Sequence, residues 1–170
     1  ATAVAIHFRV PLDAIVERAA TLKAAPHRGE AIRTARGVTI IDDSYNSSPS
    51  ALRQAFEILR HASGARRIAV VGEMLELGVQ TVALHEQFGP IAVRTGLDRL
   101  LTVGGEPARA LGVAATNSGM PAQAVLHVET SEQASLEAVA MVRSGDLVLV
   151  KGSRGIKTDL VVERLRAAFD

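Results

Sequence analysis

Short aliphatic runs alternate with stretches of helical periodicity from residue 30 to the end of the chain. The aliphatic runs lie at 38–41, 68–71, 100–103, 124–128 and 147–150. Helices are predicted between and after them, near 49–61, 80–95, 105–113, 131–143 and 157–168. Near-continuous β-branched runs are typical of strands that are covered on both faces, as in parallel sheets. The pattern therefore predicts an α/β fold: a Rossmann-like, open and mostly parallel sheet with helices on both faces.

A hairpin is expected at the start of this region. Residues 30–34 and 38–42 flank Arg36-Gly37, and a glycine between two such segments is a turn signal. One strand of the hairpin should therefore pair antiparallel at the edge of the sheet.

The segment before the hairpin has a helical pattern. Apolar residues recur at helical spacing over 11–22, and residues 2–8 resemble the tail of an earlier helix. So short a helical pair has no core of its own, and Pro26-His27-Arg28-Gly29 then breaks the pattern. We therefore expect a boundary at residue 28, which divides the chain into 1–28 and 29–170.

Composition narrows the class of protein. The chain has 170 residues, 48% of them hydrophobic and 22% charged, so a packed core is expected and disorder is not. Cysteine is absent, which excludes disulfides, thiolate nucleophiles and cysteine-ligated metals. A net charge of +1, with four Phe, one Tyr and no Trp, argues against nucleic-acid binding. No apolar run approaches the ~18 residues of a membrane span, so we expect a cytoplasmic protein without membrane insertion.

Ligands of open parallel sheets bind beyond the carboxyl ends of the strands, and three such ends here are rich in polar residues or glycine. The first is Asp42-Asp43-Ser44-Tyr45-Asn46-Ser47-Ser48-Pro49, where two carboxylates end a strand and a polar loop leads into a helix. Carboxylates can hold ribose hydroxyls, and free N–H groups at a helix start favour phosphate or carboxylate. The alternative is a serine-rich turn that only caps the helix.

The second and third strand ends carry charges of opposite sign. Gly72-Glu73-Met74-Leu75-Glu76-Leu77-Gly78 offers two glutamates that suit an ammonium group or a metal, and that are equally typical of solvated loop charges. His85 follows on the next helix, where a lone histidine is more often structural or exposed than catalytic. Lys151-Gly152-Ser153-Arg154-Gly155-Ile156-Lys157 gathers three cations that suit a carboxylate or phosphate, or that answer an acidic neighbour.

Several catalytic and nucleotide-binding motifs do not occur in the sequence. There is no G-x-x-x-x-G-K-[ST], so the chain has no P-loop for ATP phosphates, and no G-x-G-x-x-G follows the first strand. A Ser-His-Asp hydrolase is also disfavoured, because no G-x-S-x-G is present.

Together, the three polar segments resemble those of the Mur ligases. The first is similar to D-D-S-Y-N-A-N-P, the second, with His85 after it, to G-[DE]-M-x-E-L-G, and Val150-Lys151-Gly152-Ser153-Arg154 to V-K-G-S-R. These motifs point, within the family, to the type that adds D-alanyl-D-alanine to the peptidoglycan precursor. The sequence departs at Ser47-Ser48, where that type usually has Ala-Asn, and serine for a cap-forming asparagine is a mild change.

The resemblance implies a three-domain, ATP-dependent ligase. Its substrates would be UDP-N-acetylmuramoyl-tripeptide and D-alanyl-D-alanine, joined through an acyl phosphate. Residues 29–170 would be the Rossmann-like C-terminal domain, and residues 1–28 the last helices of the central ATPase domain and the linker. The partners of this chain would then be the N-terminal and central domains of the same protein. ATP and Mg²⁺ would be held mainly by the central domain, so the isolated chain is expected to be inactive.

The same resemblance assigns roles to individual residues. The expected ATP-binding residues are Arg28, Asp43, Tyr45 and Asn46. The expected D-alanyl-D-alanine side is formed by Lys151, Ser153, Arg154, Glu76 and His85. Arg154 would bind the free carboxylate of the dipeptide. No catalytic residue and no metal ligand is expected in this chain.

Two alternatives stay open at the level of sequence. One is a stand-alone Rossmann-like module that binds a nucleotide or dipeptide without catalysis. The other is a related ligase, such as a folylpolyglutamate or cyanophycin synthase, which Tyr45-Asn46 and the 74–78 segment disfavour.

Overall fold

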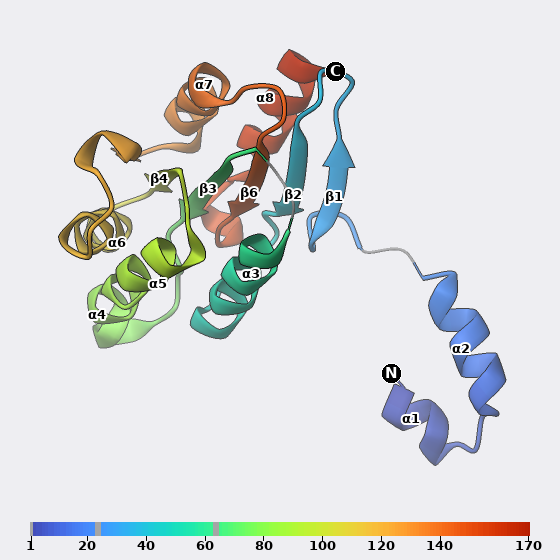
Figure 1. Cartoon of the computed structure of the whole chain (residues 1–170). Coiled ribbons are helices and arrows are strands. Elements are labelled where there is room, and N and C mark those ends of the chain that lie inside the picture. The colour runs from blue at the N-terminus through green and yellow to red at the C-terminus, as the bar shows by residue number, and fades with distance from the viewer. Residues whose placement is uncertain (1, 23–24, 63–64) are drawn as a thin grey trace.

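The computed structural model describes residues 2–22, 25–62 and 65–170, whose main body is an α/β domain (Figure 1). Within these residues one sheet has the strand order β1-β2-β6-β3-β4-β5. Its strands are β1 (Glu30–Arg33), β2 (Thr39–Asp43), β3 (Arg67–Gly72), β4 (Arg99–Val103), β5 (Val125–Val128) and β6 (Leu147–Lys151). β1 pairs antiparallel with β2, and every other neighbouring pair is parallel. The predicted fold and its antiparallel edge strand are confirmed.

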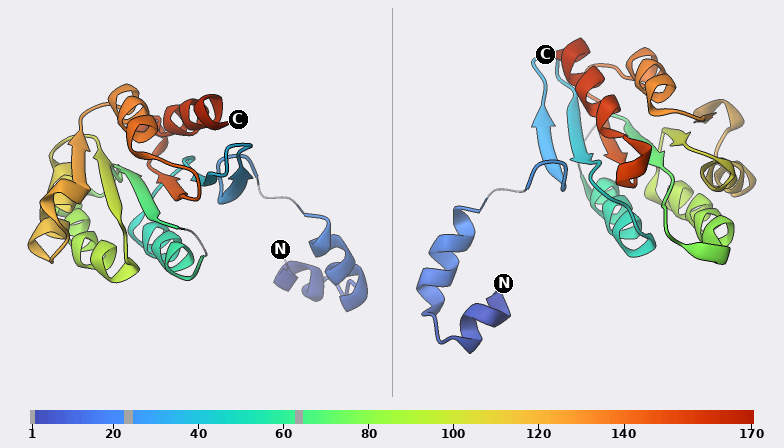
Figure 2. Two further views of the ribbon diagram at one scale, coloured as in Figure 1. Left: turned by 45° about the horizontal axis from the view of Figure 1, so that its top comes forward. Right: turned by 180° about the vertical axis from the view of Figure 1, so that it is seen from behind.

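Helices cover both faces of the sheet, as expected (Figures 1 and 2). They are α3 (Pro49–His61), α4 (Thr81–Glu86), α5 (Phe88–Thr95), α6 (Glu106–Asn117), α7 (Ser131–Met141) and α8 (Asp159–Phe169). On one face α3, α5 and α6 contribute to a core with the alternate strand residues Ala69, Val71 and Leu149. On the other face α7 and α8 pack against Ile68, Val70 and Val148. Alternate residues of one strand thus enter opposite cores, which explains the continuous apolar runs.

Two details differ from the expected elements. The helix predicted near 80–95 is two helices, α4 and α5, which meet at Gln87. Pro90 has no N–H to donate back along a continuous helix, which favours a break at this place. A short 3-10 turn at Gly78–Gln80 precedes α4. The run at 124–128 is not covered on both faces: no residue of the edge strand β5 is buried, and Leu126 is 37% exposed.

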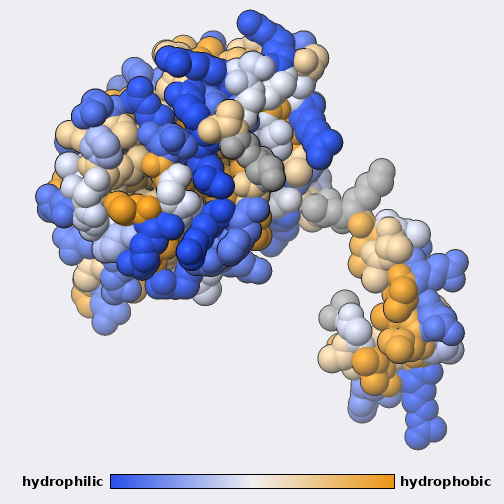
Figure 3. All heavy atoms as spheres, in the orientation of Figure 1, coloured by the Kyte–Doolittle hydropathy of each residue, from blue (hydrophilic) through white to orange (hydrophobic). Residues whose placement is uncertain are grey.

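The N-terminal helices α1 (Thr2–His7) and α2 (Leu12–Ala20) stand apart from the sheet (Figure 2). Neither helix contains a buried residue. Their apolar side chains lie open in Figure 3, and Phe8 is 74% exposed. Three residues of the predicted 1–28 unit, Ala1, Lys23 and Ala24, lie outside the described residues. No helix in the described ranges has both the length and the apolar character that a membrane crossing requires.

Candidate functional site

The three polar strand ends predicted from the sequence converge at one edge of the sheet. They follow β2, β6 and β3, and these strands are neighbours. In the register of the sheet, Asp43 lies beside Lys151, and Lys151 lies beside Val71. Because all three strands run in the same direction, the loops after them emerge side by side and form a single site.

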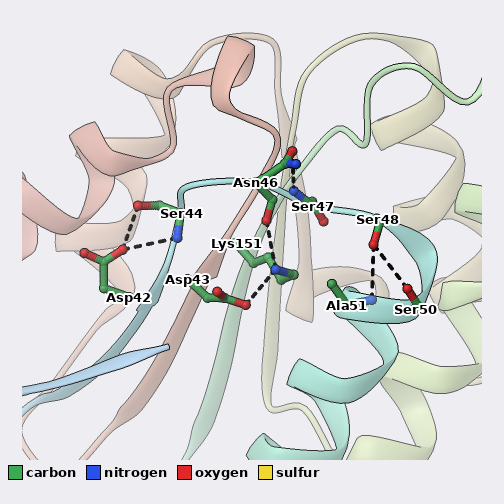
Figure 4. A network of polar contacts seen from close by, with 9 residues as sticks. All are labelled: Asp42, Asp43, Ser44, Asn46, Ser47, Ser48, Ser50, Ala51 and Lys151. Carbon is green, nitrogen blue, oxygen red and sulfur yellow. Dashed lines mark hydrogen bonds and ion pairs between the residues drawn. The ribbon is translucent and has the colours of Figure 1, made fainter. Parts of the chain in front are cut away.

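A partly buried ion pair joins the first loop to the third (Figure 4). Lys151 Nζ donates to Asp43 Oδ2 at 2.6 Å and to the backbone oxygen of Asn46 at 2.9 Å. The Lys151 side chain is only 2% exposed, whereas that of Asp43 is 26% exposed. The Lys151 ammonium is therefore occupied within the protein, and it fixes the loop of residues 44–48 against β6.

Two arginines lie close to the ring of Tyr45. The Arg28 guanidinium is 4.0 Å from the centre of the Tyr45 ring, and that of Arg154 is 5.3 Å away. Arg154 Nη1 also donates to the Tyr45 hydroxyl at 3.4 Å. The hydrogen bond from Arg154, together with the closeness and positive charge of both guanidinium groups, lowers the pKa of the Tyr45 phenol. The linker arginine and the third loop thus meet at the single tyrosine of the chain.

The second loop is held in place by His85 and Ser153. His85 Nε2 accepts a hydrogen bond from the Met74 N–H at 2.9 Å, and its Nδ1 lies 2.7 Å from the Thr81 carbonyl oxygen. The Nδ1–H therefore donates to that carbonyl. His85 is fully buried, and this burial lowers its pKa. Ser153 Oγ accepts from the Leu75 N–H at 2.9 Å, which ties the third loop to the second.

Two cavities open on either side of the loop of residues 45–48. One, of about 400 Å³, is lined by Arg28, Asp43, Tyr45, Asn46 and Lys151 among others. The other, of about 470 Å³, is lined by Tyr45, Asn46, Glu76, Ser153 and Arg154 among others. Ser47 and Ser48 line both cavities, and the Ser48 hydroxyl caps α3 by accepting from the Ala51 N–H.

The structure thus sorts the residues proposed from the sequence into three groups. Arg28, Asp43, Tyr45 and Asn46 share the first cavity, and Glu76, Ser153 and Arg154 share the second. Lys151, which was expected on the dipeptide side together with Ser153 and Arg154, lines the first cavity, with its charge paired to Asp43. His85 lines neither cavity, and both its ring nitrogens are bonded within the protein. Its geometry favours the structural alternative over direct contact with a ligand.

His27 was not singled out from the sequence, although it takes part in the site. Its Nδ1 lies 2.8 Å from Asp42 Oδ2, and Asp42 is 2% exposed. Within Pro26-His27-Arg28, His27 thus contacts Asp42, whereas Arg28 lies over the Tyr45 ring. No local sequence pattern predicted that His27 would reach the end of β2.

In the part of the chain that the structure describes, no three His, Asp or Glu side chains are grouped as they would be around an ion. The cations and hydrogen-bond donors of the two cavities instead suit anionic and hydroxyl-bearing ligands.

Comparison with known proteins identifies related sequences and structures. A family model described as "Mur ligase, glutamate ligase domain" matches residues 27–154. The chain is 35% identical to the UDP-N-acetylmuramoyl-tripeptide--D-alanyl-D-alanine ligase of Mycobacterium tuberculosis, over 98% of this chain and 36% of that protein. The chain therefore spans about a third of the length of this curated relative.

Solved structures agree with this similarity. The MurF ligase from Thermotoga maritima in complex with ADP has a TM-score of 0.73 and 29% identity, covering 88% of this chain and 33% of that one. MurF from Acinetobacter baumannii shares the fold with a TM-score of 0.80 at 24% identity, covering 96% of this chain and 35% of that one.

Proposed function

We propose that this chain, which belongs to the Mur ligase family because its residues 27–154 match the family's glutamate ligase domain, is part of an ATP-dependent ligase. The ligase would join D-alanyl-D-alanine to UDP-N-acetylmuramoyl-tripeptide in peptidoglycan synthesis. The observation that carries this proposal is the convergence of three loops at the ends of β2, β6 and β3. Each loop resembles the motif of the D-alanyl-D-alanine-adding type, and residues of the three segments line the two cavities. The names of the relatives at 34–35% identity support the same reaction.

The proposed organisation makes residues 29–170 the C-terminal domain and residues 1–28 the last helices of the central domain with the linker. Exposed apolar side chains on α1 and α2 support this division, because such a surface favours cover by further protein. The sequence has no P-loop motif, so the ATP phosphates and Mg²⁺ are held mainly by the central domain. The isolated chain then does not turn over. The nucleotide-linked substrate and ATP place the enzyme in the cytoplasm.

The first cavity is the proposed nucleotide side. Arg28 is exposed at its rim, where its guanidinium suits a phosphate oxygen. One oxygen of Asp43 accepts from Lys151, and the other suits a ribose hydroxyl. Tyr45 and Asn46 complete the wall. When ATP is bound, it supplies the phosphoryl group that activates the tripeptide carboxylate.

The second cavity is the proposed dipeptide side. Arg154 can pair with the free carboxylate of D-alanyl-D-alanine through its two-pronged guanidinium, and Glu76 can attract the amino group. Ser153 lines the same space while its oxygen holds the Leu75 N–H. Lys151 and His85 act as positioning residues, since each holds a loop in place through groups that are already paired.

In this arrangement the loop of residues 45–48 lies between the two substrates. It would orient the dipeptide amine toward the carboxylate that ATP activates, while the surrounding cations stabilise the anionic groups. Such positioning can supply a large part of a rate enhancement without any residue of this chain taking part in bond making.

The test is an amine panel with the complete gene product that contains this chain. Phosphate release from ATP is measured with UDP-N-acetylmuramoyl-tripeptide and either D-alanyl-D-alanine, D-alanine, L-alanine or D-glutamate. Of the four amines, we expect only D-alanyl-D-alanine to support turnover by the complete gene product. We expect no turnover from residues 1–170 by themselves. Turnover with a single amino acid in place of the dipeptide would assign another member of the family, and activity of the isolated chain would refute the proposed domain division.

A further inference from the structure

His27 attaches the linker to the end of β2 through two bonds. Its ring Nδ1 lies 2.8 Å from Asp42 Oδ2, and its backbone oxygen accepts from the Tyr45 N–H at 3.0 Å. The Gly29 N–H also donates to the Asp42 backbone oxygen at 2.8 Å. The residues on both sides of Arg28 are therefore bonded to the segment that carries Tyr45.

The contact between the His27 ring and Asp42 matters because the Asp42 carboxylate is buried. Its side chain is 2% exposed, and its Oδ1 accepts from the Ser44 hydroxyl at 2.6 Å and from the Ser44 N–H at 3.2 Å. Among the described residues, His27 is the one basic side chain that contacts this carboxylate. A buried carboxylate is costly without partners, so Asp42 favours the conformation in which the ring of His27 is close to it.

The backbone of His27 adds a second constraint. Its φ is +61°, a left-handed conformation that non-glycine residues adopt rarely. Because that conformation is unfavourable in isolation, the contacts of His27 must hold it. This left-handed conformation turns the chain so that the Arg28 guanidinium lies over the Tyr45 ring, 4.0 Å from the ring centre.

We propose that His27 is a positioning residue that, through Asp42, holds Arg28 over the Tyr45 ring. The bond to Asp42 sets the path of the linker, and the path of the linker sets the place of the arginine. That Arg28 so placed then meets the phosphates of ATP rests on the function proposed above. The positioning itself is a property of the chain alone.

The experiment uses the fact that Tyr45 is the only tyrosine in a chain without tryptophan. In the 170-residue chain, the absorbance of the phenolate gives the titration midpoint of Tyr45 without interference. At neutral pH, the ring-current shift of the Arg28 side-chain protons in NMR spectra reports the stacking directly. Neither measurement requires ligase activity, so failure of the proposed function leaves this test intact.

His27→Gly is the main variant, because glycine adopts positive φ freely and only the ring is lost. We expect the Arg28 ring-current shift to disappear and the Tyr45 titration midpoint to rise partway toward that of an ordinary tyrosine, since Arg154 remains. His27→Asn should restore wild-type behaviour, because asparagine tolerates left-handed backbone and its amide can donate from the position of Nδ1.

Ser44→Ala is the matched control. It removes another donor to Asp42 and a longer contact, at 3.5 Å, between the Ser44 hydroxyl and His27 Nδ1. The 2.8 Å contact between His27 and Asp42 stays, so both signals should stay as in the wild type. Wild-type signals in His27→Gly would overturn the proposal, as would equal changes in Ser44→Ala. If His27→Gly does not fold, His27→Asn decides: wild-type signals support the proposal, and loss of the ring-current shift refutes it.

Discussion

Replacing Lys151 with methionine tests the ion pair that joins two loops of the site. Methionine keeps most of the apolar stem of the lysine inside the protein and removes the ammonium group. The substitution leaves two acceptors without their donor, Asp43 Oδ2 at 2.6 Å and the Asn46 backbone oxygen at 2.9 Å. Asp43 then loses the one ion-pair partner that it has among the described residues.

The magnitude follows from the burial of each partner. Removing one member of a fully buried pair costs ~3–5 kcal/mol. Asp43 is 26% exposed and can be partly rehydrated, so the low end applies. We expect Lys151→Met to lower the free energy of unfolding by about 3 kcal/mol, a large part of the ~5–15 kcal/mol typical of a domain.

Urea denaturation of the 170-residue chain, followed by circular dichroism and by Tyr45 fluorescence, measures this loss. The midpoint should fall while the slope with urea stays constant, because the same surface is exposed on unfolding. The double variant Asp43→Asn/Lys151→Met should be less destabilised than the sum of the single variants, since it leaves no unpaired charge. The exposed Lys157→Met is the control, expected within about 0.5 kcal/mol of the wild type. A loss below about 1 kcal/mol for Lys151→Met, or additive single variants, would refute this reasoning.

Two further predictions concern stability. Burial lowers the pKa of His85 and of His127. Their contribution to stability is therefore complete above the ordinary histidine pKa of about 6.5 and is lost as the pH falls toward the folded pKa, by up to ~1.4 kcal/mol per pH unit for each group. His85→Gln should reduce the loss of stability per pH unit on the acid side, measured from urea midpoints, without abolishing it, and an unchanged loss would contradict a buried neutral ring at His85. A Cβ on Gly89 would meet backbone atoms of Ala114 and Ala115 where α5 packs on α6, so Gly89→Ala should lower the free energy of unfolding by about 1–3 kcal/mol. Gly105→Ala, whose Cβ would lie 3.4 Å from a flexible Glu73 carboxylate oxygen, should cost less in the same assay, and equal losses would contradict close helix packing as the cause.

The elements of the fold were largely predictable because their signals are local. The β-branched runs at 68–71, 100–103 and 147–150 became central strands, and α3 begins at Pro49 after the Ser48 cap. The exposure of β5 was not predictable, because strand order depends on contacts between distant segments. The break between α4 and α5 had a signal in Pro90 that helical periodicity outweighed.

The site was predictable as a set of loops but not as a set of contacts. Motif spacing indicated which strand ends carry polar residues, and parallel strands bring such ends to one edge. The sequence left open whether the cations of residues 151–157 meet a ligand or an acidic neighbour, and in the structure Lys151 is paired with Asp43, which lies 108 positions away in the sequence. His27 contacts Asp42 from a left-handed backbone conformation, and no local pattern encodes that conformation at a histidine.

The dependence of turnover on the dipeptide in an Arg154 variant tests most directly whether these strand ends hold the incoming D-alanyl-D-alanine. In the complete gene product, Arg154→Ala should raise the KM for D-alanyl-D-alanine by about tenfold or more, since a hydrogen bond between charged groups contributes ~1.5–3 kcal/mol. The KM for ATP should change by less than about twofold, and the exposed Arg164→Ala should leave both constants unchanged. An unchanged KM for the dipeptide, or an equal rise in the KM for ATP, would contradict the assignment of this cavity to the dipeptide.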